Sequence, residues 1–116
     1  MAKKISQKRM IAFNKKVSDL VERQFDATLI HQREDGAKSW SLQTKAGELR
    51  ISVHSPEPSH CFSIFTCFED VKKANEIVKE VGLDDHLNPY SGKWNYHLSN
   101  ETDCLAYFEG SLNKIV

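Results

Sequence analysis

The sequence has no hydrophobic run long enough to cross a membrane. A transmembrane helix needs roughly 18 or more consecutive apolar residues, and no stretch of this chain approaches that length. The first residues, Met-Ala-Lys-Lys-Ile-Ser, also lack the apolar segment of a secretory signal. We therefore expect a cytoplasmic protein that does not associate with membranes.

Cysteine is scarce, with three residues in the chain. Cys61 and Cys67 fall in one expected strand, where a rise of about 3.3 Å per residue places them about 20 Å apart, too far for a disulfide. We expect reduced cysteines that act as small apolar groups. The cysteines and the five histidines form no Cys-x-x-Cys or His-x-x-x-His pattern. Neither a metal site nor a cofactor is therefore expected.

Net charge is also absent, because 16 Lys and Arg balance 16 Asp and Glu. The balance is uneven along the chain: residues 1–58 carry 11 basic against 7 acidic side chains, and residues 59–116 carry 5 against 9. Contact with nucleic-acid phosphates is an alternative function, and the candidate residues are Lys8, Arg9, Lys15, Lys16 and Arg50. A neutral chain lacks the basic footprint usual in a dedicated nucleic-acid binder. A solvated helix face is the competing interpretation.

What the sequence does contain is ordinary for one folded domain. It has 116 residues, of which 40% are hydrophobic and 28% charged, enough for a single core without metal or disulfide staples. No linker or repeat divides the chain, so we expect a single α+β domain over residues 1–116 with a basic N-terminal helix.

Hydrophobic periodicity predicts the element order α-β-β-β-β-α-β-α. Helical spacing of apolar residues after Ser6 predicts a helix over residues 6–25. Short alternating runs separated by turn residues predict strands at 27–32, 39–44, 48–54 and 61–68. A helix capped by Asp70 and ended by Gly82, a strand at 93–98, and a helix from Ser99 or Asn100 to Asn113 complete the chain.

The alternation within these strands predicts an antiparallel sheet of about four to five strands, covered on one face by helices. The covered side is apolar, with Trp40, Ile51 and Ile64 among its residues. The opposite side is mixed and includes Arg50 and His54. We interpret it as a solvated surface, with Arg50 and His54 as a weaker candidate for binding.

The segment "NPYSGKWNYH", Asn88 to His97, concentrates aromatic residues around a Ser-Gly turn. Trp94 and Tyr96 alternate inward and are expected in the core, although an interface role for Trp94 stays open. The accessible residues are the candidate partner-binding set, namely Tyr90, Lys93, Asn95 and His97. Exposed tyrosines suit protein interfaces because they bury a large area at little entropic cost.

Motifs that carry chemistry are missing. The chain has no Gly-rich phosphate loop and no Gly-x-Ser-x-Gly elbow. Capping and solvation explain its paired carboxylates, and Asp103 and Glu101 near Cys104 are expected to raise the pKa of that thiol. We expect no catalytic residues and no enzyme activity, and a small enzyme without a recognisable site is the third interpretation.

Two segments carry a resemblance to a known group of proteins. The stretch "SIFTCFEDVKKAN" followed by "NPYSGKWNYH" and a last helix resembles small proteins encoded by phages, prophages and other mobile elements of proteobacteria. The likeness covers roughly residues 48 to 112, and its marker is the segment Asn-Pro-x-Ser-Gly-Lys-Trp-Asn-x-His. The group has no known catalytic residues, so none carry over.

The resemblance implies a context in a bacterial host cell. Small phage proteins of this kind often occupy a surface of a host protein, and inhibitors of CRISPR effectors and other defence systems are prominent among them. The leading expectation is therefore a phage-type accessory protein that binds and inhibits a host protein complex. Nucleic acid is the second choice of partner, and the sequence does not specify an oligomeric state.

Overall fold

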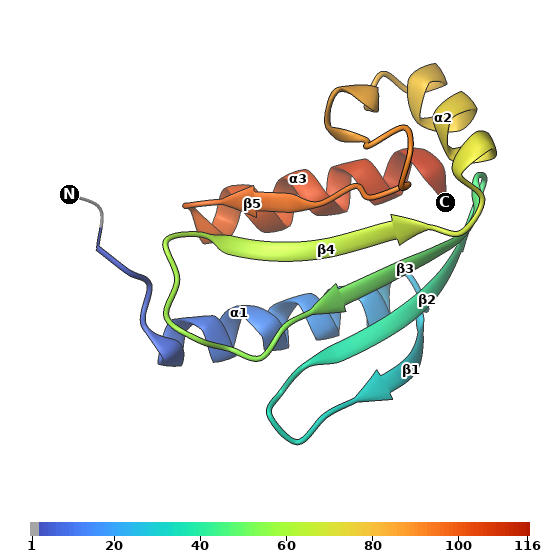
Figure 1. The fold of residues 1–116 in the computed structure, drawn as a ribbon. Helices are drawn as coiled ribbons and strands as arrows, with labels where there is room; N and C mark the ends of the chain where they lie inside the picture. The colour runs from blue at the N-terminus through green and yellow to red at the C-terminus, as the bar shows by residue number, and fades with distance from the viewer. Residues whose placement is uncertain (1–2) are drawn as a thin grey trace.

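The chain folds as one antiparallel sheet of five strands with helices packed against it (Figure 1). The computed structural model describes residues 3–116. Strands are adjacent in the order in which they occur, β1-β2-β3-β4-β5. The predicted α+β class and the order α-β-β-β-β-α-β-α are confirmed.

The helices begin where local capping predicts. Ser6 accepts a hydrogen bond from the Arg9 amide at 3.3 Å and starts α1 (Gln7–Asp19). Asp70 caps α2 (Val71–Glu80), and Asn100 caps α3 (Glu101–Ile115) by accepting from the Asp103 amide at 3.0 Å. The predicted first helix ends differently, because a π-helical turn (Leu20–Gln24) follows α1.

Figure 1 shows α1 and α3 on the same side of the sheet, behind it in that view. An ion pair of 3.1 Å between Lys16 of α1 and Glu101 of α3 joins the two helices. The shorter α2 lies beyond the end of β4 in the same figure. One broad face of the sheet is therefore covered, and the other is left open.

Four of the five strands lie within one or two residues of their predicted bounds. They are β1 (Thr28–Gln32), β2 (Lys38–Thr44), β3 (Gly47–Val53) and β4 (Phe62–Phe68). The fifth, β5 (Tyr96–Leu98), is shorter than the predicted 93–98. The Thr66 amide donates to the side chain of Asn95 at 3.1 Å instead of to a backbone carbonyl, which interrupts the ladder.

The core lies between the covered face of the sheet and the two helices behind it. Trp40, Ile51 and Ile64 of the sheet are fully buried, as are Phe13 of α1 and Phe108 of α3. Burying each such side chain contributes about 1.5–3 kcal/mol, so the alternating pattern fixes which face the helices cover.

The aromatic segment enters this core as predicted. Trp94 and Tyr96 are 0% and 1% exposed, and Trp94 Nε1 donates to the Leu83 carbonyl at 3.2 Å. Trp94 is therefore a core residue and not an interface residue. A short 3₁₀ turn (Asp84–His86), which periodicity does not reveal, packs the His86 ring against both side chains.

The three cysteines differ in burial. Cys104 is fully buried, and this burial raises the pKa of its thiol to about 11. The raised pKa was expected, but its main cause is burial and not the neighbouring Asp103. Cys61 and Cys67 are only half-buried on the other face of the sheet, so the expectation of buried apolar cysteines holds for Cys104 alone.

Within residues 3–116, no helix is long and apolar enough to cross a membrane.

Candidate binding surface

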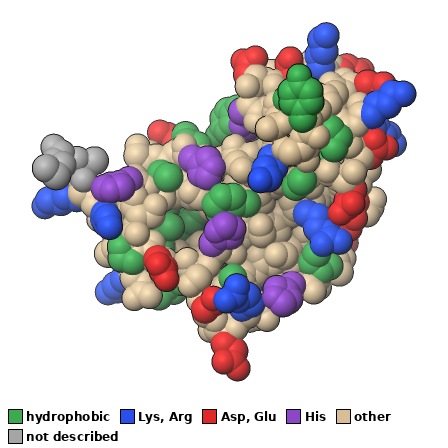
Figure 2. Space-filling model, in the orientation of Figure 1, with side chains coloured by type: hydrophobic (Ala, Val, Ile, Leu, Met, Phe, Trp, Pro, Cys, Tyr) green, Lys and Arg blue, Asp and Glu red, His purple; other side chains and the backbone are tan. Residues whose placement is uncertain are grey.

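The uncovered side of the sheet, here called the open face, collects side chains from three neighbouring segments. Alternation turns every second residue toward it, and the antiparallel registers of β3, β4 and β5 bring these residues together. Its members are Arg50, Ser52, His54, Ser63, Phe65, Cys67, Lys93, Asn95 and His97. Figure 2 views the molecule from this side and shows hydrophobic, basic and histidine side chains intermingled.

A shallow depression of about 350 Å³ lies in the middle of the open face. It is lined by residues of β3 and β4, by His54 directly after β3, and by Lys93 and Asn95 from the segment before β5. Such a hollow gives the face a shape into which a protruding group of a partner can fit.

Three aromatic rings form a strip at this depression, and two of them, His54 and Phe65, line it. The imidazole of His54 stacks on Phe65 with ring centroids 3.9 Å apart and planes 9° from parallel. His97 meets the same Phe65 edge-on at 5.4 Å. Ser63 Oγ and His97 Nδ1 are hydrogen-bonded at 2.8 Å, which orients the His97 ring. The strip is thus held in place before any partner arrives.

Tyr90 stands beside the open face on a loop whose backbone is held by hydrogen bonds to the side chains of Asn88 and Asn75. Asn88 Oδ1 accepts from the amides of Tyr90 and Ser91 at 2.9 and 3.1 Å. Asn75 Nδ2 of α2 donates to the Pro89 carbonyl at 3.1 Å. The Tyr90 side chain is nevertheless 91% exposed. An exposed aromatic ring on an ordered loop costs little entropy when it is buried by a partner.

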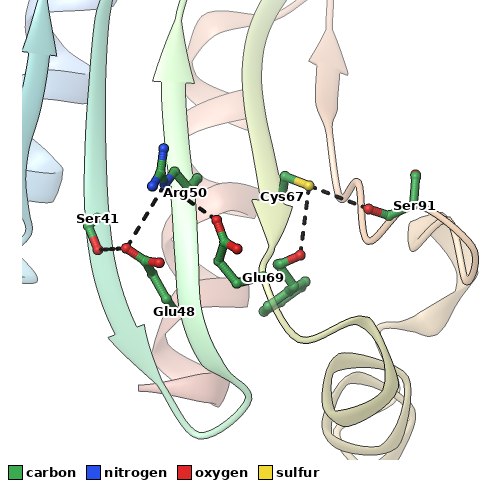
Figure 3. Close-up of polar contacts among 7 residues, drawn as sticks. Ser41, Glu48, Arg50, Cys67, Glu69 and Ser91 are labelled. Carbon is green, nitrogen blue, oxygen red and sulfur yellow. Dashed lines mark hydrogen bonds and ion pairs between the residues drawn. The ribbon is translucent and has the colours of Figure 1, made fainter.

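The charges of the open face balance one another. Arg50 Nε lies 3.7 Å from a carboxylate oxygen of Glu69 and 4.0 Å from one of Glu48, and Ser41 Oγ donates to that Glu48 oxygen at 2.6 Å (Figure 3). Among residues 3–116, Lys93 takes part in no ion pair. Arg50 and Lys93 thus share this surface with two carboxylates, both of which lie beside Arg50, so the surface has no strong positive field.

The structure brings the predicted partner-binding residues to one region. Lys93, Asn95 and His97 share the open face, and Tyr90 is on the adjoining loop. Asn95 also has a structural role, because its side-chain oxygen accepts a hydrogen bond from the Thr66 amide of β4. Sequence reasoning did not find the ring strip of Phe65, His54 and His97, since cross-strand register decides which rings touch.

The predicted nucleic-acid set is divided between two sides of the molecule. Lys8, Arg9, Lys15 and Lys16 are exposed on α1, behind the sheet, whereas Arg50 belongs to the open face in front of it. Lys16 is paired with Glu101, and the Arg9 guanidinium lies over the Phe62 ring at 5.5 Å. The five residues therefore form no single patch.

The described residues show no metal-ligand cluster, and the open face contains one Ser–His pair. In the described part of the chain, no three His, Cys, Asp or Glu side chains converge as metal ligands. Ser63 and His97 are paired, but among residues 3–116 His97 makes no hydrogen bond through Nε2 that would orient it as a base.

A scan of family models, a search of curated proteins and a search of solved structures each found no match.

Proposed function

We propose that this chain is a non-enzymatic binding protein that docks its open face and Tyr90 loop onto a host protein and blocks the complex to which that protein belongs. The observation that carries the proposal is the preorganised ring strip of His54, Phe65 and His97 beside the exposed Tyr90. Aromatic residues on ordered backbone are the usual anchors of protein interfaces.

A protein partner suits the charges of this face better than a nucleic acid does. Nucleic-acid affinity rests on cations that are free to neutralise phosphates. Arg50 is held by two carboxylates, so Lys93 is the remaining cation. A polyanion would meet Glu48 and Glu69 at the same surface. A neutral face with central rings and a polar rim is the arrangement typical of protein–protein contacts.

The inhibitory part of the proposal comes from the resemblance of residues 48 to 112 to small phage and mobile-element proteins. A protein of this size can inhibit by occupying a surface that a larger complex needs for its own contacts. A bacterial defence effector is the partner class that this context favours.

The experiment is a comparative capture from bacterial lysate. Tagged wild-type protein, a Tyr90→Ala/Lys93→Glu variant and a Lys15→Glu variant are used as parallel baits, and bound proteins are quantified by mass spectrometry. Lys15→Glu makes the same charge change on α1, behind the sheet. We expect one host complex to be recovered by the wild type and by Lys15→Glu, and to be at least about tenfold depleted with the face variant.

Three results would contradict the proposal. The first is equal recovery of the same complex by all baits, and the second is loss with Lys15→Glu alone. The third is recovery of many unrelated proteins that disappears after nuclease treatment, which would favour nucleic-acid binding. The melting temperature of each variant shows whether it is folded, and the exposure of Tyr90 and Lys93 predicts little change.

A further inference from the structure

Two basic side chains flank the depression of the open face in one row across the sheet. Arg50 of β3 registers with Cys67 of β4, and Cys67 in turn forms a bridge with Lys93. Residues directly opposite on neighbouring strands share a face. Strands lie about 4.8 Å apart, so the backbones of Arg50 and Lys93 are about 10 Å apart with the small Cys67 between them. Two long side chains at this spacing can reach one group held above Cys67.

A second row supplies an aromatic wall and a further hydrogen-bond donor. Ser52 registers with Phe65, and the register of β4 with β5, continued toward Lys93, sets Phe65 beside Asn95. Asn95 Oδ1 accepts the Thr66 amide at 3.1 Å, so Nδ2 is the end of its side chain that is available to donate. The depression thus combines basic groups, an amide donor and an aromatic ring.

The carboxylates of the open face stand outside the depression. Among the described residues that line it, none is Asp or Glu. Glu48 precedes Arg50 on β3, and Glu69 lies beside Glu48 because its amide donates to the Glu48 carbonyl at 3.1 Å. The lining residues Ser52 and His54 follow Arg50 in the opposite direction. Figure 3 shows both carboxylates on the side of Arg50 nearer the turn that joins β2 to β3. The depression itself therefore has basic walls, although the face around it is neutral.

Neither basic side chain is saturated by contacts within the fold. Both ion pairs of Arg50 join its Nε to carboxylate oxygens, at 3.7 and 4.0 Å. These distances exceed the roughly 2.7–3.2 Å of an N–H···O hydrogen bond, and the side chain is 54% exposed. Lys93 is also exposed and forms no ion pair among residues 3–116. Both can donate to an acceptor that a partner brings.

We infer that, when the open face docks as proposed above, the depression receives the carboxylate of an Asp or Glu side chain of the host protein, and that a neighbouring apolar side chain packs on Phe65. The inference rests on the proposed function, which supplies the partner. Charge complementarity selects the occupant, because Lys93 and Arg50 can donate charge-assisted hydrogen bonds to one carboxylate. A nucleic-acid strand brings a series of phosphates, and those beyond the first would meet Glu48 and Glu69.

The test is an NMR titration of the full chain with two matched dipeptides, N-acetyl-Asp-Phe-amide and N-acetyl-Asn-Phe-amide. We expect the Asp dipeptide to shift the backbone amide signals of Arg50, Cys67 and Lys93, with a dissociation constant on the order of 1–10 mM. The Asn dipeptide should bind at least about fivefold more weakly, because it offers no charge to the two cations. Lys93→Gln should weaken binding of the Asp dipeptide about three- to tenfold. Lys45→Gln, in the turn between β2 and β3, should leave it unchanged.

Three results of the titration would overturn the inference. The first is equal binding of the two dipeptides, or no shift of these signals at up to about 20 mM. The second is unchanged affinity of the Lys93→Gln variant, whose own spectrum shows that it is folded. The third is tighter binding of the dinucleotide TpT than of the Asp dipeptide at the same signals, which would identify a phosphate site instead.

The captured host complex gives a second readout. A carbodiimide joins an amine to a carboxylate that touches it, taking up the water that is released, and adds no spacer. We expect it to form an amide bond between Lys93 and an Asp or Glu of the host protein. A complex that is captured but not coupled at Lys93 would overturn the inference and leave the proposed function standing. Selective binding of the Asp dipeptide with no captured complex would contradict the proposed function and support the carboxylate chemistry of the depression.

Discussion

His86 is a partly buried residue whose ionisation is tied to the fold. Its ring meets Trp94, Tyr96 and Tyr107 edge-on at 4.9 to 5.4 Å, and its buried Nε2 has no hydrogen-bond partner among residues 3–116. Burial lowers the pKa of His86 because the protonated ring loses its hydration. The unfolded chain, with an ordinary histidine pKa of about 6.5, therefore takes up this proton first as the pH falls.

The free energy of unfolding should accordingly decrease as the pH falls below about 6.5, and the loss should end once the folded-state pKa has been passed. His86→Phe keeps an aromatic ring at this position and removes the proton-binding site. We expect its free energy of unfolding to change less than that of the wild type between about pH 7.5 and 5.5. The difference amounts to about 1.4 kcal/mol for each unit by which the pKa of His86 is lower in the folded than in the unfolded state. Urea unfolding at several pH values measures this, and parallel curves for the two proteins would contradict it.

At the residue scale, sequence alternation predicts whether a side chain points inward or outward better than it predicts which side chains touch. It correctly places Trp94 and Tyr96 in the core and leaves Lys93 and His97 outside. It does not show that Phe65 lies between His54 and His97, because that contact depends on how β3, β4 and β5 are aligned. Register is set by the whole sheet and not by any one strand.

At the scale of elements, the Tyr90 loop depends on Gly92. Its φ of 79° is in the left-handed region, and a Cβ there would lie 2.9 Å from the Phe68 carbonyl oxygen and 3.1 Å from Val71 Cγ2. Gly82, at the end of α2, has a similar φ of 76°, but a Cβ at that position would meet no atom within 4 Å. Alanine substitutions at the two glycines therefore distinguish the cost of backbone strain alone from the cost of strain combined with steric overlap.

Gly82→Ala should therefore cost only the strain of the left-handed conformation, about 1 kcal/mol. Gly92→Ala should cost about 1–3 kcal/mol more, since neighbouring backbone must also move. Chemical denaturation of both variants measures the difference. Equal destabilisation would show that the loop can relax around a methyl group, contrary to a rigid presentation of Tyr90.

The sequence predicts most elements because their signals are local. The caps at Ser6, Asp70 and Asn100 need only the residues of the following turn. The late start of β5 has a non-local cause, since the Asn95 side chain accepts a hydrogen bond from the amide of Thr66, which is 29 positions away. The π-helical turn after α1 is likewise invisible to a pattern that assumes 3.6 residues per turn.

At the scale of the whole molecule, the positive charge of the first half is partly used within the fold. Lys16 pairs with Glu101 across the two helices, and Arg50 pairs with Glu48 and Glu69 on the far side of the sheet. Ion pairs inside one domain thus neutralise part of the opposite net charges of the two halves. The remaining basic residues of α1 give a narrow surface for phosphates.

We expect weak or undetectable binding of DNA or RNA oligonucleotides at physiological salt. Each phosphate contact would add roughly 0.9 to the slope of log affinity against log salt concentration, so a narrow basic surface gives a shallow slope. Fluorescence anisotropy with labelled oligonucleotides measures both quantities. A dissociation constant well below about 1 μM, with a steep salt dependence that Lys8→Glu/Lys15→Glu removes, would support nucleic-acid binding through α1.

A partner that binds as proposed contacts the open face and its Tyr90 loop. Site-specific photo-cross-linking tests this contact directly, with benzoylphenylalanine placed either at Tyr90 or at Ile11, a residue of α1 that is 52% exposed. Irradiation of the captured complex should give a cross-linked host protein from position 90 and little or none from position 11. Cross-linking from position 11 with none from position 90 would place the partner on the helical side and contradict the account.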